Sequence, residues 1–233
     1  MKQFLLRKII IISFFLAISF IIEIVINKTI FQSHCNEALL KLELLPIILI
    51  GFLFGFKFSF FFNLLYILIH SILEFAIMEH HFEILGVNIV HHWWLRLGLI
   101  FFVFVVPYLA YSISGFFYCH SKKHLMNHQT IVKSLIFISL IQILSYFLFT
   151  MMINYFQKES SISFESLSHN VFIELLLTPI QGVAQIIFVY YFASIMITNI
   201  TLGIILYFLN PVLKENIKFF DMTIYNGIST NKK

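Results

Sequence analysis

Residues Leu44–Met78 have the sequence LLPIILIGFLFGFKFSFFFNLLYILIHSILEFAIM, and the predicted arrangement of helices follows from them. It consists of two apolar halves separated by a break at Gly55-Phe56-Lys57. The first half has about a dozen residues, whereas a helix needs roughly 20 apolar residues to cross a bilayer. We therefore predict a short helix here that is stable only when other helices surround it.

Small residues recur along the same stretch at one-turn spacing. Gly51, Gly55 and Ser59 are each four positions apart, which places them on one face of a helical hairpin. In membranes, such small-xxx-small patterns allow neighbouring backbones to approach closely. The pattern predicts a tight helix–helix contact at the break.

The second half carries a stripe of polar side chains on one helix face, formed by Asn63, Tyr66, His70 and Glu74. A charged side chain at the centre of a bilayer costs about 2.5–3.5 kcal/mol even on lenient scales. The stripe is therefore expected to face protein or a cavity, and Glu74 becomes a candidate charge partner for a ligand.

The overall composition is that of a polytopic membrane protein. Of the 233 residues, 60% are hydrophobic and 11% are charged, a balance that soluble domains do not have. We predict an all-α integral membrane protein, a six-helix transmembrane bundle that forms one domain over residues 1–233 and has a short second helix. The expected helices cover about 9–26, 44–56, 59–78, 95–118, 131–156 and 180–209, and Pro211 is expected to end the last one.

Charge asymmetry predicts the orientation of this bundle. Six spans place both termini on one side, where eleven Lys and Arg residues face two acidic residues. The other side has four basic and nine acidic residues. By the positive-inside rule both termini are cytoplasmic, and we expect a multi-pass protein of the bacterial plasma membrane.

No enzyme signature is present in the sequence. It contains no P-loop, no Rossmann glycine pattern, no H-E-x-x-H and no G-x-S-x-G. We therefore expect neither an enzyme nor a bound cofactor, and no nucleic-acid partner. If the protein moves a solute, the energy comes from a partner or a gradient.

Polar and aromatic side chains concentrate toward the predicted outer half, where they would line a small-molecule pocket. For the two tryptophans the alternative is an interfacial belt, and for the stripes on the third and fifth helices it is hydrogen bonding between helices. The predicted substrate-binding residues are Glu74, His91, Trp93, Trp94, Tyr146, Asn154, His169, Asn170 and Gln181.

The predicted loop EHHFEILGVNIVHHWW at Glu79–Trp94 supports a second hypothesis about the function. Imidazole and carboxylate ligands suit zinc or nickel. The alternative function is therefore an integral membrane protein that binds or transports metal through its external histidines and glutamates. A third hypothesis is a membrane enzyme or assembly factor without a recognisable motif.

Two stretches together resemble one protein family. The run LELLPIILIGFLFGFKFSFFFNLLYILIHSIL at Leu42–Leu73 is similar to the second and third helices of S components, the substrate-binding subunits of energy-coupling factor (ECF) vitamin transporters, especially the thiamine-specific branch. The run FVVPYLAYSISGFF resembles that branch's following helix, although Val105 and Val106 replace its aspartate and tyrosine. The residues that fit are Pro46, Gly51, Gly55, Lys57, Pro107, Ser114 and Gly115.

The segment SLSHN at Ser166–Asn170 resembles the family's Ser-Leu-x-Tyr-Asn ligand loop, with His169 in place of the tyrosine. The resemblance implies capture of a small water-soluble, thiamine-like vitamin from outside. It also implies assembly with a transmembrane coupling protein and two cytoplasmic ATPase subunits. The family docks through an Ala-xxx-Ala surface on its first helix, and Ser13 and Ala17 have the same spacing.

The charge asymmetry yields a direct topology test. A reporter fused after Lys233 or inserted at Lys122 should read cytoplasmic, because the basic residues gather on that side. A reporter inserted near Glu83 or Ser161 should read external. A cytoplasmic signal at Glu83 would contradict the predicted helix assignment.

Overall fold

The computed structural model describes residues 2–25, 40–84, 97–117, 127–160 and 183–215, and all regular structure in these ranges is helical. This confirms the all-α prediction for the described part of the chain. The elements are α1 (Lys2–Val25), α2 (Leu44–Phe54), α3 (Phe56–Ile84), the π-helical η3 (Leu99–Val105), α5 (Val106–Ala110), the 3₁₀-helical η4 (Tyr111–Phe117), α6 (His128–Ser160) and α8 (Val183–Glu215).

Four helical stretches are long and apolar enough to cross a membrane. They are Lys8–Val25, Ile100–Phe117, His128–Met152 and Phe188–Leu213, and two shorter apolar helices cover Leu44–Phe54 and Phe56–Ile72. These lengths indicate a membrane protein. The count of six spans and the orientation of the termini stay predictions.

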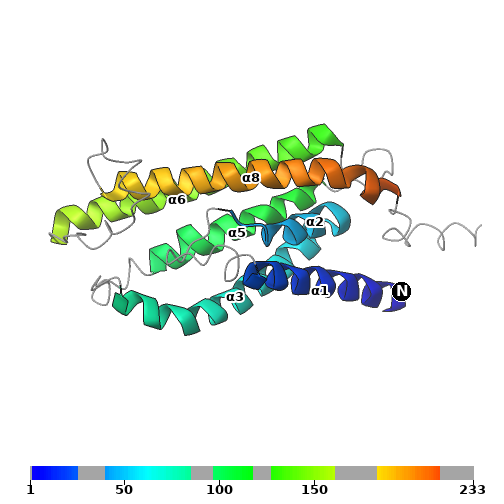
Figure 1. Ribbon diagram of the computed structural model, residues 1–233, viewed down its shortest axis with the longest axis horizontal. Helices are drawn as coiled ribbons and strands as arrows, with labels where there is room; N and C mark the ends of the chain where they lie inside the picture. The colour runs from blue at the N-terminus through cyan, green and yellow to red at the C-terminus, as the bar shows by residue number, and fades with distance from the viewer. Residues whose placement is uncertain (1, 26–39, 85–96, 118–126, 161–182, 216–233) are drawn as a thin grey trace, which may run out of the picture.

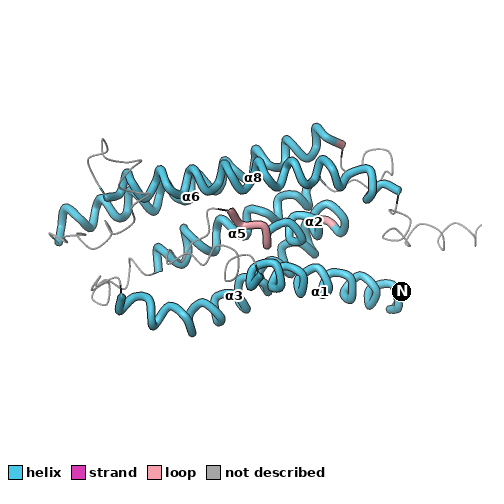
Figure 2. Tube along the Cα trace, in the orientation of Figure 1, coloured by secondary structure: helices cyan, strands magenta, loops and turns pink. Residues whose placement is uncertain are grey.

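The helices run roughly along the long axis of the molecule (Figure 1). Helices α6 and α8 lie side by side and run antiparallel, while α1, α2 and α3 occupy the opposite side. The start of α1 and the end of α8 lie at the same end of the molecule. The tube in Figure 2 shows that α2 and α3 are joined by a sharp corner.

Helix α2 is enclosed by its neighbours α1, α3 and η4. Every residue of α2 except Leu45 is buried, as expected for a helix that is apolar on all sides. The predicted short helix is therefore present, and neighbouring helices enclose it. The helix ends at Gly55, whose φ of 87° lies in the left-handed region that favours glycine.

Gly51 in α2 and Gly115 in η4 lie where the two helices touch, and neither position has room for a side chain. A Cβ placed on Gly51 would lie 1.8 Å from Ser114 Oγ, and one on Gly115 would lie 2.4 Å from the Cα of Phe56. The Ser114 hydroxyl lies 3.1 Å from the carbonyl oxygen of Ile48 and thereby links the two helices. The predicted close approach is present, and η4 is the partner of the glycine face.

Some predicted boundaries were wrong. Helix α3 begins directly at Phe56, because the left-handed Gly55 turns the chain within a single residue. Helix α8 continues through Pro211 to Glu215, whereas the sequence predicted an end there. Pro211 has no backbone N–H to donate to the carbonyl of Tyr207, and α8 continues past it for one further turn.

The glycine contact generates a stability prediction. Gly115→Ala should destabilise the protein by about 1–3 kcal/mol, the usual cost of overpacking, because its Cβ would meet backbone atoms. Gly203→Ala is the matched control, since its Cβ would lie 3.0 Å from the flexible end of Leu135. Thermal unfolding of both variants in detergent measures the difference. Equal melting temperatures would argue against the tight contact.

Candidate functional site

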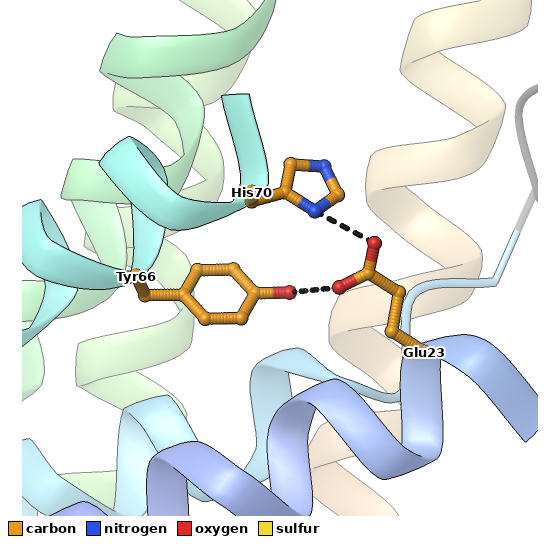
Figure 3. Close-up of polar contacts among 3 residues, drawn as sticks. All are labelled: Glu23, Tyr66 and His70. Atoms are coloured by element: carbon orange, nitrogen blue, oxygen red, sulfur yellow. Dashed lines mark hydrogen bonds and ion pairs between the residues drawn. The ribbon is translucent and has the colours of Figure 1, made fainter. Parts of the chain in front are cut away.

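A carboxylate on α1 meets two polar side chains of α3 inside the helical assembly (Figure 3). Tyr66 donates a hydrogen bond of 2.9 Å from its hydroxyl to Glu23 Oε2. The Nδ1 atom of His70 lies 2.6 Å from Glu23 Oε1, an ion pair when the imidazole is protonated. The side chains of His70 and Glu23 are only 4% and 16% exposed, so water screens this contact weakly.

Aromatic rings surround the imidazole of His70. It stacks on Phe104 at a centroid distance of 4.9 Å and on Tyr66 at 5.6 Å. Tyr108 lies 5.7 Å away in a tilted arrangement. These contacts fix the ring plane, so that Nδ1 stays directed at Glu23 (Figure 3).

Two further ionisable residues precede α2 and lie close to this group. The ammonium of Lys41 lies 5.1 Å from the centroid of the Tyr108 ring, in cation–π range. Glu43 is 1% exposed, and its Oε2 has no hydrogen-bond partner among the described residues. It lies within electrostatic range of Lys41, Glu23 and His70. We call Glu23, Lys41, Glu43 and His70 the ionisable cluster.

Burial raises the pKa of Glu43 to about 7, against the opposing attraction of Lys41. Glu43 belongs to the turn before α2 and lies outside the helices that can cross a membrane. The backbone N–H of Lys41 donates to Thr198 Oγ1 at 3.2 Å, which ties this turn to α8. A carboxyl group that titrates near neutrality can bind or release a proton under ordinary conditions.

A second polar network connects η4, α6 and α8. The Tyr111 hydroxyl donates to Asn199 Oδ1 at 2.8 Å, and Asn199 Nδ2 donates to Ser139 Oγ at 2.8 Å and to Gln142 Oε1 at 2.9 Å. On the other side, Asn63 donates to the carbonyl of Tyr108 at 2.6 Å. These bonds satisfy polar groups between helices, as a membrane interior requires.

Helix α6 satisfies the backbone carbonyls that irregular geometry leaves without partners. Pro107 has no N–H, so the carbonyl of Val103 loses its usual helical donor, and the Tyr146 hydroxyl donates to it at 3.2 Å. Ser145 donates to the carbonyl of Phe102 at 2.6 Å, and Gln142 Nε2 donates to that of Pro107 at 3.1 Å. The polar stripe of α6 therefore supports the irregular helix opposite.

The sequence-predicted residues fall into three groups. Asn63, Tyr66 and His70 are buried, so the α3 stripe faces protein as predicted. Tyr146 is buried and stacks on Tyr191 with centroids 4.4 Å apart, and its role in substrate binding stays a prediction. The third group lies outside the described residues: the side chains of Glu74 (in α3) and Asn154 (in α6), and all of His91, Trp93, Trp94, His169, Asn170 and Gln181.

Glu23 and Glu43 were not among the site residues predicted from the sequence. Glu23 interrupts an otherwise apolar run, and a carboxylate within a span is a functional candidate by default. That signal was available for Glu23. Glu43 stands at the edge of a polar loop, and only the fold shows that it is buried.

Comparison of the chain with protein-family models, curated proteins and solved structures found no match. Within the described ranges, no group of three or more His, Cys, Asp or Glu side chains is placed to hold a metal ion. Of the residues in the metal hypothesis, Glu79, His80, His81 and Glu83 continue α3 with side chains outside the described part, and His91 and His92 lie outside the described ranges.

The buried carboxyl of Glu43 predicts a pH-dependent stability. Its folded pKa of about 7 exceeds the ordinary 4.5, so the folded protein binds the proton more tightly than the unfolded chain. The free energy of unfolding should therefore fall as pH rises from about 4.5 to about 7, by roughly 3 kcal/mol at most from this group.

Glu43→Gln removes the titrating carboxyl group. Unfolding measured across this pH range should therefore show a flatter dependence of the free energy of unfolding on pH. Glu215→Gln, in the last turn of α8, is the control and should keep the slope of the unmodified protein. An unchanged slope in Glu43→Gln would contradict the assignment of the pH dependence to this carboxyl.

Proposed function

We propose that the protein is the substrate-binding S component of an ECF-type importer, which captures a small water-soluble nutrient. The observation that carries the proposal is the ionisable cluster inside the helical assembly. Glu23 and Glu43 come from separate parts of the chain and lie within electrostatic range of each other and of His70. Ionisable groups among membrane helices are costly, and binding or transport is their usual reason.

A second support comes from the contact between the two stretches that resemble the family. Gly51 and Gly55 come from the hairpin and Ser114 and Gly115 from the following helix, and they meet in one tight contact. Motifs far apart in sequence thus form one structural unit. The turn at Gly55 brings α3 back against α2, and Glu43 before α2 lies within electrostatic range of His70.

The ligand is best matched by a solute with a cationic or hydrogen-bonding group and an aromatic ring. Carboxylates supply charge-assisted bonds, each worth about 1.5–3 kcal/mol, and Tyr108 already accepts an ammonium on its face. The backbone of Glu74 lies one helical turn beyond His70 on α3, so it extends the same stripe. Trp93 or Trp94 would stack on the ring, and Asn170 would fix its orientation.

Import would need a partner, because no nucleotide-binding motif occurs in the sequence. Ser13 and Ala17 are exposed on α1, together with the large side chains of Ile10, Phe14 and Ile21. Only 17% of the spanning window of α1 is buried inside the protein. This face is available for a coupling protein or for lipid, and we assign it to the coupling protein of the proposed importer.

Ligand screening on the purified protein tests the proposal. A vitamin-like compound should raise the melting temperature, whereas a response to zinc or nickel alone would favour the metal reading. Glu74→Gln should then weaken a cationic ligand by about ten- to a hundredfold, the loss of one charge-assisted bond. Affinity and melting temperature are measured on the same preparations.

The control variant is Ala17→Trp, at the exposed face of α1. It should keep the ligand affinity and lose co-purification with the coupling protein. Unchanged affinity in both Glu74→Gln and Asn170→Ala would contradict the proposed binding residues. The absence of any stabilising vitamin-like compound would count against the S-component function itself.

A further inference from the structure

The charges of the ionisable cluster do not balance without an added proton. With both carboxyls ionised and Lys41 protonated, Glu23, Glu43 and Lys41 carry one net negative charge. One proton, held by Glu43 or by His70, makes the cluster neutral. Neutrality matters here because an uncompensated charge in a low-dielectric interior is expensive.

The same residues hold α1 against α3. Helix α1 is the least enclosed of the four long spans, since 17% of its window is buried against 33–44% in the others. Near the end of α1, Glu23 contacts α3 through Tyr66 and His70, while Lys8 lies 5.5 Å from the Phe58 ring centroid near the start of α1. Ser19, by contrast, bonds within α1 to the carbonyl of Phe15.

We propose that the ionisable cluster is a proton-binding site, and that its single exchangeable proton holds the end of α1 against α3. When the proton leaves, Glu23 and Glu43 both carry negative charge and repel each other. The His70 imidazole, once neutral, no longer offsets that charge. The end of α1 then moves away from α3.

The surroundings of the cluster contain no described charge that would replace the proton. Tyr66, Tyr108 and Tyr111 are neutral hydroxyl-bearing rings, and α8 contributes the uncharged Thr198 through its bond to Lys41. The raised pKa of Glu43 agrees with proton binding near neutral pH. Within the described ranges, the titratable groups that face the cluster are Glu23 from α1, Lys41 and Glu43 from the turn before α2, Tyr66 and His70 from α3, Tyr108 from α5 and Tyr111 from η4.

The inference goes beyond the proposed function and does not depend on it. A proton that controls α1 would make the assembly pH-sensitive whatever solute it binds. A bound proton would also explain why Glu43 Oε2 can be buried without a described hydrogen-bond partner. A proton on Glu43 lowers the cost of burying that carboxyl.

Spin labels at positions 24 and 72 test the proposal. Ile24 and Ile72 are 52% and 69% exposed and lie one and two residues beyond the Glu23–His70 contact. The labels replace them after Cys35 and Cys119 are changed to serine. Dipolar EPR spectroscopy should show a short interlabel distance at about pH 5.5, and a longer or broader distribution at about pH 8.5.

Glu43→Gln should keep the short distance at both pH values, because it removes the charge that repels Glu23. Tyr66→Phe is the matched control: it removes one hydrogen bond to Glu23 but no titrating charge, so the pH response should persist. The proposal is overturned if the unmodified protein shows one distance at both pH values. It is equally overturned if Glu43→Gln opens at high pH as the unmodified protein does.

Discussion

Polar groups among membrane helices must find partners within the protein, because hydrocarbon offers none. This constraint accounts for the contacts that connect the helices. The carbonyl of Val103, which Pro107 leaves without a helical donor, receives the hydroxyl of Tyr146. Glu23 is the most demanding case, since a carboxylate needs both charge and hydrogen bonds, and α3 supplies them through His70 and Tyr66.

The glycine contact between α2 and η4 determines where the ionisable cluster can form. Because Gly51 and Gly115 lack side chains, α2 lies directly against η4. The chain turns at Gly55, and α3 runs back along α2. His70 on α3 therefore lies near the N-terminal end of α2, which directly follows Glu43. Packing by small residues thus brings together charges that lie far apart in the sequence.

The sequence predicted those features of the fold that repeat with the helical period or follow from length. The α3 stripe recurs on one face, so the burial of Asn63, Tyr66 and His70 could be predicted. The short apolar run before Gly55 required an enclosed helix, and α2 is enclosed. The π-helical geometry near Phe102 has no periodic signal in the sequence. The sequence therefore could not predict which α6 side chain donates a hydrogen bond to the Phe102 carbonyl.

For the site, one carboxylate was predictable in principle and the other was not. Glu23 lies inside an apolar run, but a single sequence does not say which helix it faces. The burial of Glu43 depends on contacts from residues distant in the chain. The side chains of the predicted pocket residues from Glu74 to Gln181, with Tyr146 excepted, lie outside what the structure describes, and their roles stay predictions.

In the proposed function, the ionisable cluster binds a ligand in addition to connecting helices. The most direct test compares Glu23→Gln with Ser145→Ala, which removes a structural hydrogen bond to Phe102 in another part of the bundle. For a cationic compound that stabilises the protein, we expect Glu23→Gln to weaken binding at least about tenfold, the equivalent of about 1.4 kcal/mol. Ser145→Ala should lower the melting temperature and keep the affinity. If Glu23→Gln lowers stability but binds the compound as tightly as the unmodified protein, the cluster only holds helices together and the claim is contradicted.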